Sequence, residues 1–176
     1  MRRVVVTGLG IVSSIGNNAA EVTESLKQGK SGIEFMPEYR DLGFRSQVAG
    51  TLKLDVDALV DRRLRRFMGD GSAYAWVAMS EAIADAGLTE AEISNERTGL
   101  IAGSGGPTTG AIVQAAITTK EKGPKRVGPF VVPRAMSSTI SANLGTAFKI
   151  KGPSYSISSA CSTSAHCIGN AAELIG

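Results

Sequence analysis

The chain has 176 residues, of which 43% are hydrophobic, 20% are charged and 5% are aromatic. This composition excludes a disordered or fibrous protein and, with 21 glycines, is typical of an α/β protein with many tight turns. The formal net charge of +3 is too small to indicate a general nucleic-acid-binding protein, although it leaves room for a local basic patch. The length suits one core-bearing domain or one half of a duplicated fold.

The first residues, a basic start followed by an apolar run, superficially resemble a signal peptide. Thr7, Gly8 and Gly10 interrupt that run, and polar residues follow where an apolar stretch would have to continue. No run of 18 apolar residues occurs in the sequence, so no membrane span is expected. We therefore predict a cytoplasmic protein in a reducing compartment.

The first predicted elements are a strand and a capped helix. The β-branched stretch 2–7 is predicted to be a buried strand. A helix over 20–28 is expected next, with Asn17 or Asn18 as its N-cap and Gly29 at its end.

The middle of the chain is predicted to be mainly helical. Residues 30–54 are expected to be irregular, because glycines and a proline punctuate them. A short basic helix is predicted over 57–66. The strongest helical pattern of the sequence follows over 67–86, and Gly87 closes it.

The last third returns to alternating strands and helices. A strand over 97–102 runs into a glycine-rich turn, and a helix over 109–119 precedes a loop with three prolines. A helix over 135–148, a strand over 155–158 and a last helix from Cys161 complete the chain. This alternation predicts an α/β fold with a largely parallel sheet. The last helix is still running where the sequence stops, which suggests a fragment.

Two glycine-rich turns resemble nucleotide-binding motifs without completing them. The first, with Gly8 and Gly10, has Ser13 where the third glycine of a dinucleotide-binding loop would lie. The second, over 103–107, lacks the Gly-Lys-Ser/Thr ending of a phosphate-binding loop. We interpret the first as a tight turn between strand and helix, and the second as a turn that another group can approach closely.

The stretch SSACSTSAHC, at 158–167, holds both cysteines and the only histidine. A structural zinc site requires four ligands, and if Cys161 opens a helix, His166 and Cys167 lie about 140° and 240° around it. The three side chains then cannot converge on one metal ion, and His166 cannot pair with Cys161 in catalysis. Six helical residues also span about 9 Å, too far for a disulfide. We interpret His166 as a packed or hydrogen-bonded residue and Cys167 as a core residue.

Cys161 is a candidate nucleophile, because it lies where a predicted strand turns into a predicted helix. Its small neighbours allow a bulky acyl group to approach the sulfur. The N–H groups of a helix N-terminus favour the thiolate and could stabilise an oxyanion when a thioester is attacked. The residues alone leave a buried structural cysteine equally open.

Several motifs together resemble the N-terminal half of β-ketoacyl-acyl carrier protein synthases, most of all the type I enzymes of bacterial fatty-acid synthesis. They extend over essentially all 176 residues: VTGLGIVSSIGNN, DRRLRRFMGD, AIADAGL, GLIAGSGG, KRVGPF and YSISSACSTSAHCIGNA. The resemblance implies a thiolase-like fold in which two α/β halves form five αβαβα layers. Residues 1–176 would be the first half, usually within a homodimer, with no cofactor and no metal ion.

The resemblance also implies a reaction. Cys161 takes an acyl chain from acyl carrier protein as a thioester, and its own backbone N–H contributes to the oxyanion hole. Malonyl-carrier protein then loses CO₂, and the resulting carbanion attacks that thioester. The family's two catalytic histidines, its catalytic lysine and its second oxyanion donor lie in the C-terminal half. His166 matches none of them, so this chain alone is expected to be inactive.

Two further positions match the acyl pocket of the family. Gly106 matches a glycine of the type I members, where type II members carry a bulkier residue, and Met136 matches a residue near the pocket at the dimer contact. Without the resemblance they would be a turn glycine and a core methionine. A polyketide-type ketosynthase and a non-catalytic folding or interaction fragment remain the alternative functions.

Basic residues form two clusters in the sequence. The first comprises Arg62, Arg63, Arg65 and Arg66, and the second Lys120, Lys122, Lys125 and Arg126. From the pattern alone they form a solvated face or pair with nearby aspartates, and no aromatic residues interleave them to stack nucleic-acid bases. In the family, Arg62, Arg63 and Arg66 match docking positions for the acidic acyl carrier protein. We predict that Lys125 and Arg126 belong to the same docking surface.

Overall fold

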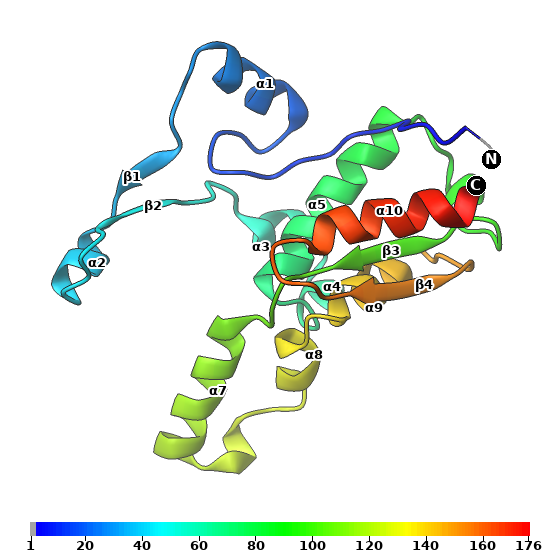
Figure 1. Cartoon of the computed structure of the whole chain (residues 1–176). Coiled ribbons are helices and arrows are strands. Elements are labelled where there is room, and N and C mark those ends of the chain that lie inside the picture. Colours follow the sequence, from blue (N-terminus) through cyan, green and yellow to red (C-terminus); the bar gives the residue numbers. More distant parts are fainter. Residues whose placement is uncertain (1–2) are drawn as a thin grey trace.

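The computed structural model describes residues 3–176, and its centre is a small parallel sheet (Figure 1). The strands β3 (Leu100–Gly103) and β4 (Ser154–Ile157) pair along their whole length. α10 (Thr163–Ile175) packs on one face of this sheet and α9 (Thr139–Ala147) on the other, with α5 (Asp70–Asp85) against α9. This helix–sheet–helix layering confirms the predicted α/β fold.

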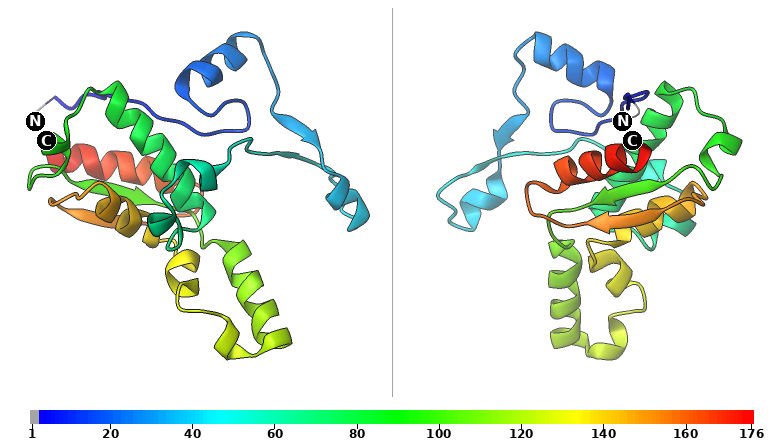
Figure 2. Two further views of the ribbon diagram at one scale, coloured as in Figure 1. Left: turned by 180° about the vertical axis from the view of Figure 1, so that it is seen from behind. Right: turned by 45° about the vertical axis from the view of Figure 1, so that its right-hand side comes forward.

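The connection between the two parallel strands begins with a helical projection, which α9 follows. The projection consists of α7 (Thr109–Lys122), the 3₁₀ helix η1 (Pro124–Arg126) and α8 (Val131–Ala135). Figures 1 and 2 show it extending away from the sheet, with η1 at its far end. The prediction of a loop after 119 was therefore wrong. Its first proline, Pro124, occupies the first turn of η1, where the missing N–H costs no hydrogen bond.

Residues 19–54 form a second extension, an arm, which leaves the molecule away from the projection (Figure 2). α1 (Ala19–Lys27) leads into β1 (Ile33–Phe35), which pairs antiparallel with β2 (Val48–Gly50), and α2 (Pro37–Asp41) lies between the two strands. The prediction that residues 30–54 are irregular was therefore wrong. Glycine and proline punctuate a hairpin as readily as a loop.

The limits of α1 confirm the capping signals in the sequence. The side chain of Asn18 accepts a hydrogen bond from the N–H of Glu21 at 2.9 Å. Gly29 takes a φ of +62°, which glycine adopts without strain, directly after the helix.

The stretch predicted as the first strand forms no strand within its described part, 3–7; Arg2 lies outside the described residues. Val4, Val5 and Val6 are 36%, 60% and 86% exposed. A strand needs a neighbouring strand to satisfy its backbone groups, and within residues 3–176 none lies beside this segment. The valine run therefore remains extended but unpaired.

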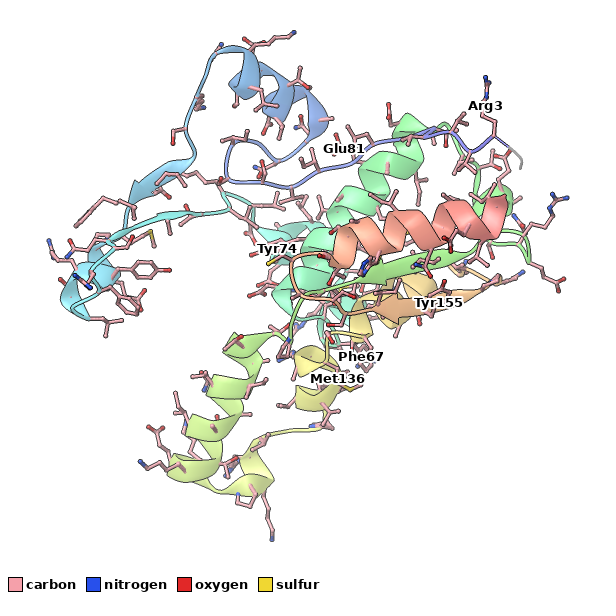
Figure 3. The ribbon with its side chains drawn as sticks, viewed as in Figure 1. Arg3, Phe67, Tyr74, Glu81, Met136 and Tyr155 are labelled. Atoms are coloured by element: carbon pink, nitrogen blue, oxygen red, sulfur yellow. The ribbon has the colours of Figure 1, made fainter. Side chains whose placement is uncertain are left out.

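The segment that follows the valines lies on α5 instead. The N–H of Leu9 donates to Asp85 Oδ2 and that of Ile11 to Glu81 Oε2, both at 2.9 Å, and Figure 3 shows Glu81 beside this segment. A Cβ atom on Gly8 would lie 2.2 Å from a backbone oxygen of α5, and one on Gly10 only 1.7 Å. The two glycines thus permit direct contact between two backbones. The predicted tight turn lies after them, where Ser13 and Gly16 exchange backbone hydrogen bonds at 2.9 and 3.3 Å before α1.

The predicted basic helix is two short helices, α3 (Val56–Leu59) and α4 (Arg62–Arg65). They separate at Val60, which has an extended backbone and a buried side chain, and Asp61 caps α4 by accepting from the N–H of Arg63 at 2.7 Å. A hydrophobic cluster of Val56, Val60, Met68 and Ala73 joins these helices to α5. Burying Val60 in that cluster interrupts the helix.

Like α2 and α8, the short helix α6 (Glu90–Ile93) was not predicted, and several limits differ by a few residues. α6 carries a complete capping box between Thr89 and Glu92, a signal that the sequence does contain. α5 begins at Asp70 rather than 67, after the extended Gly69, and α9 begins at Thr139 rather than 135.

The described chain exposes more surface than a compact protein of its size. Its accessible area is 11691 Å², against roughly 8,100 Å² for a compact monomer of this mass. Three large apolar side chains of α10 contribute, because Ile168, Leu174 and Ile175 are 70%, 59% and 54% exposed. Among residues 3–176, none of the helices combines the length and the hydrophobicity that crossing a bilayer requires.

Candidate active site

Cys161 lies in the turn between β4 and α10, and its side chain is exposed. The helix begins at Thr163, so the prediction that Cys161 opens it was wrong by two residues. Ala160 takes a φ of +48°, in the left-handed region that no α-helix contains. The chain therefore completes a turn at Cys161 before the helix starts.

The loop after β3 packs against this turn. Because β3 and β4 are parallel, the loop after β3 and the Cys161 turn lie at the same edge of the sheet, where α/β proteins commonly bind their ligands. Ser158 Oγ donates to the backbone oxygen of Ser104 at 2.9 Å. A Cβ atom on Gly105 would lie 2.7 Å from the oxygen of Ala160, so only glycine allows this approach. The prediction that the second glycine turn admits a closely approaching group is confirmed.

Gly106 belongs to this loop and has open space beside it. A Cβ atom added there would meet no atom within 4 Å. Its backbone oxygen accepts a hydrogen bond from Ser104 Oγ at 2.9 Å, which holds the loop conformation. The structure thus brings Gly106 to the same edge of the sheet as Cys161, and the space beside Gly106 would accommodate a larger side chain.

Met136 lies elsewhere, directly after α8 and before α9 (Figure 3). It is 49% exposed, so the alternative of a core methionine was wrong. α8 contacts α9, which covers the opposite face of the sheet from α10. The described chain therefore does not gather Met136 and Cys161 into one enclosed pocket.

The other two candidates of the cysteine stretch differ in burial. Cys167 is 9% exposed and is a core residue as predicted. His166 is exposed, and its ring makes no hydrogen bond to residues 3–176, so the prediction of a packed or bonded histidine was wrong. Both cysteines are free. Within the described residues, no group of three His, Cys, Asp or Glu side chains is arranged to hold a metal ion.

One backbone donor lies directly beside the exposed thiol. The N–H groups of Ser162 and Thr163 donate back to Ser159 and Ala160 at 3.0 and 3.2 Å. The N–H of Cys161 itself makes no such bond within the part of the chain that the structure describes. It is therefore available to an oxygen of a group that approaches the sulfur.

The four arginines of the first basic cluster differ in their contacts: Arg65 is held within the fold, whereas the other three are exposed to solvent. Arg65 is only 21% exposed and binds Asp57 at 2.7 Å and Asp70 at 2.8 Å, while its Nη1 donates to the backbone oxygen of Met68. Burial acts to lower the pKa of Arg65, but the hydrogen bonds to the two aspartates outweigh it, and the pKa is raised. Arg65 therefore connects α3, α4 and α5.

The neighbouring arginines are exposed. Arg63 pairs with Asp61 at 3.1 Å, and hydrogen bonds from Arg63 lower the pKa of that aspartate. Arg66 stacks over the rings of Phe67 and Phe130, at 4.9 and 5.6 Å from their centres. Arg62 and Arg66 form no ion pair with any residue in 3–176.

Lys125 and Arg126 are exposed on η1, at the far end of the projection. α4 lies at the base of the projection, beside α8, so Figures 1 and 2 show the two clusters apart from each other. Within residues 3–176 they do not form one continuous basic patch.

Replacing Arg65 with alanine is expected to destabilise the fold by about 1–3 kcal/mol, since it leaves a part-buried backbone oxygen and two carboxylates without their partner. Replacing the 86% exposed Arg63 is expected to leave stability almost unchanged, because an exposed ion pair is screened by solvent. Urea unfolding measures both. Equal losses in the two variants would contradict the structural role of Arg65.

The fold and the turn together define a class: an α/β protein with an exposed cysteine at the carboxyl edge of a parallel sheet. The model of the family "Beta-ketoacyl synthase, N-terminal domain" matches residues 1–175. The chain belongs to the β-ketoacyl synthase family.

Individual relatives agree with this family. The chain is 58% identical over 177 residues to 3-oxoacyl-[acyl-carrier-protein] synthase 1 of Escherichia coli, and 54% identical over 176 residues to that of Haemophilus influenzae. Each match covers 99% of this chain but only 44% and 43% of the relative, so the chain spans less than half of their length. A β-ketoacyl synthase structure from Burkholderia phymatum superposes with a TM-score of 0.85, at 31% identity, over 99% of this chain and 44% of that one. The thiolase-like α/β fold is thereby confirmed.

Proposed function

We propose that this chain is the cysteine-bearing half of a 3-oxoacyl-[acyl-carrier-protein] synthase that elongates fatty acids. The observation that carries the proposal is the exposed Cys161, with its unpartnered backbone N–H, in a segment that aligns with synthases of that name. The substrates are acyl carrier protein loaded with an acyl group and acyl carrier protein loaded with a malonyl group. The name of the relatives specifies the carrier protein as the partner.

The chemistry at Cys161 is acyl transfer. Its thiolate attacks the carbonyl carbon of the acyl thioester on the carrier protein, and the resulting oxyanion accepts a hydrogen bond from the N–H of Cys161. Collapse of this intermediate expels the carrier's thiolate and leaves the acyl group on Sγ. In the second step, malonyl-carrier protein loses CO₂ and its carbanion attacks the carbonyl carbon of the Cys161 thioester. A carbon–carbon bond forms, the bond to Sγ breaks and releases the Cys161 thiolate, and the chain, two carbons longer, stays on the carrier protein.

The second step needs groups that this chain does not contribute. His166 is its only histidine, and it lies exposed on α10 five residues after Cys161. We therefore assign decarboxylation to residues outside these 176. Incubating the protein with acyl-carrier protein and locating the adduct by peptide mass spectrometry tests the first step, because a thioester is expected on Cys161 and on no other residue.

Two residues are proposed to shape the acyl pocket. Gly106 lies on the loop that packs against the Cys161 turn, and the open space beside it supports a role in admitting the acyl chain. Met136 is half exposed at the end of α8 and is available to a second chain. We also propose a homodimer, in which the second chain would contribute part of the pocket wall. The edge of β4 that does not face β3 is unpaired within residues 3–176, so it is open to pairing with another strand.

The fatty-acid assignment is favoured over a polyketide-type ketosynthase by the two relatives, since both are named as 3-oxoacyl-[acyl-carrier-protein] synthase 1. The carrier protein that discharges onto Cys161 distinguishes the two functions. A non-catalytic fragment would form no adduct with either carrier. The cytoplasmic location stays a prediction from the sequence.

Carrier-protein docking is proposed for Arg62, Arg63 and Arg66, with Lys125 and Arg126 as a second contact. The guanidinium groups of Arg62 and Arg66, which form no ion pair within residues 3–176, offer positive charge to an acidic partner. Because η1 and α4 lie apart, the carrier would contact both ends of the projection or only one of them.

Reversing both charges, Arg62→Glu with Arg66→Glu, is expected to weaken carrier-protein binding to the complete synthase by about tenfold or more at low salt. The loss should shrink as salt rises, because the lost interaction is electrostatic. Calorimetric titration at several salt concentrations measures it, with the exposed Lys151→Glu as the control reversal. An unchanged affinity at low salt would contradict docking at α4.

A further inference from the structure

Thr163 is a buried polar residue beside the nucleophile that the mechanism above does not use. It is the first residue of α10 and only 3% exposed. Its Oγ1 accepts a hydrogen bond from the N–H of Ser159 and donates one to the backbone oxygen of Ala160, both at 2.8 Å. One hydroxyl thus binds the two residues that precede Cys161.

The segment held by this hydroxyl has an unfavourable backbone conformation. The φ of +48° at Ala160 is rare for a residue with a Cβ atom. Such a conformation persists where surrounding contacts over-determine it. Here the backbone of Gly105 packs against the carbonyl group of Ala160, and the Thr163 hydroxyl binds the oxygen of that group.

The methyl group of Thr163 has a separate role. A Cβ atom on Gly103 would lie 2.9 Å from Thr163 Cγ2 and 1.9 Å from the backbone oxygen of Ile157. The methyl group therefore fills the space above a glycine of β3, close to where β4 ends. The methyl group packs the helix onto the sheet, whereas the hydroxyl binds only the turn.

We infer that the Thr163 hydroxyl positions Cys161 for acyl transfer by holding the Ser159–Ala160 turn. This inference rests on the proposed function. Thr163 is a positioning residue, since its hydroxyl is occupied by two backbone groups and does not face the acyl group. Transfer requires the sulfur and the N–H of Cys161 to meet one carbonyl group in one orientation, and a displacement of about 1 Å can cost a factor of 100 in rate.

Two substitutions separate the hydroxyl from the methyl group. Thr163→Val keeps the shape and removes the hydroxyl, while Thr163→Ser keeps the hydroxyl and removes the methyl group. Single-turnover acylation of the complete synthase by acyl-carrier protein is measured over a range of carrier concentrations. Thr163→Val is expected to lower the maximal rate about tenfold or more, without changing the half-saturating concentration. Thr163→Ser is expected to stay within about twofold of the parent rate.

The outcomes distinguish positioning from simple stabilisation. A parent-like maximal rate in Thr163→Val would overturn the inference, as would equal losses in both variants that follow their losses of thermal stability. Cys161→Ala is measured in parallel: an adduct that persists there refutes the proposed function, whatever Thr163 does. Loss of the adduct in Cys161→Ala with a parent-like Thr163→Val refutes the inference alone.

A second variant covers the case in which Thr163→Val does not fold. Glycine adopts a positive φ freely, so Ala160→Gly in the Thr163→Val background removes the strain that the hydroxyl would otherwise hold. The double variant is expected to fold but to acylate about tenfold or more slowly, because it lacks the hydroxyl's two hydrogen bonds and glycine at 160 adopts more backbone conformations, so the remaining backbone bonds restrain the turn less. A folded double variant with the parent rate would overturn the inference.

Discussion

Replacing Cys161 with alanine is expected to abolish the acyl-enzyme adduct and to lower condensation by the complete synthase at least about 1,000-fold. The sulfur is the only exposed thiol of the chain, because Cys167 is buried against the sheet side of α10. Without the nucleophile, the backbone N–H of residue 161 can still bind a carbonyl oxygen, but no covalent intermediate forms.

Cys167→Ala is the matched control for this substitution. It removes the second sulfur from the same helix region, at a position with 9% exposure, and should preserve both the adduct and the condensation rate. Intact-protein and peptide mass spectrometry measure the adduct in each variant. An adduct that survives in Cys161→Ala and disappears in Cys167→Ala would reverse the assignment.

The second large effect concerns the 176-residue chain produced alone, which is expected to self-associate. Ile168, Leu174 and Ile175 expose more than half of their side-chain surface on α10. Burying one such side chain gains about 1.5–3 kcal/mol, so a helix that exposes three of them favours association. Ile168→Glu with Leu174→Glu is expected to weaken association by about 100-fold or more, in line with the apolar area removed.

Sedimentation over a range of concentrations measures this association. Glu173→Gln, on the same helix, is the control and should leave it unchanged. The chain alone is also expected not to condense malonyl-carrier protein, and adding the C-terminal half in trans should restore activity that Cys161→Ala then removes. A stable monomer that condenses malonyl units unaided would contradict both expectations.

Several elements of this protein follow from local sequence alone. Asn18 and Gly29 limit α1 because capping is an interaction within four residues, and the apolar periodicity of α5 identifies that helix from its own residues. The strands β3 and β4 and the position of Cys161 directly after β4 were likewise predictable. The family resemblance rests on the same local motifs, and the family match confirms it.

Other features depend on contacts between residues that are far apart in the sequence, and these were decided by the tertiary structure. The valines at 4–6 have strong strand propensity, but a strand forms only where another strand binds its backbone, and none does so within residues 3–176. Burial of Val60 in a non-local cluster broke the basic helix, and burial of Arg65 separated it from its exposed neighbours.

The turn at the candidate site is the clearest case of such a decision. The local pattern predicts a helix from Cys161, because the residues around it are small and helix-compatible. Gly105, from the loop after another strand, instead closes on Ala160, and Thr163 holds the same residue at a positive φ. The sequence by itself determined which residue carries the thiol, while the backbone around it was set by bonds within the turn together with a contact to a segment more than 50 residues away.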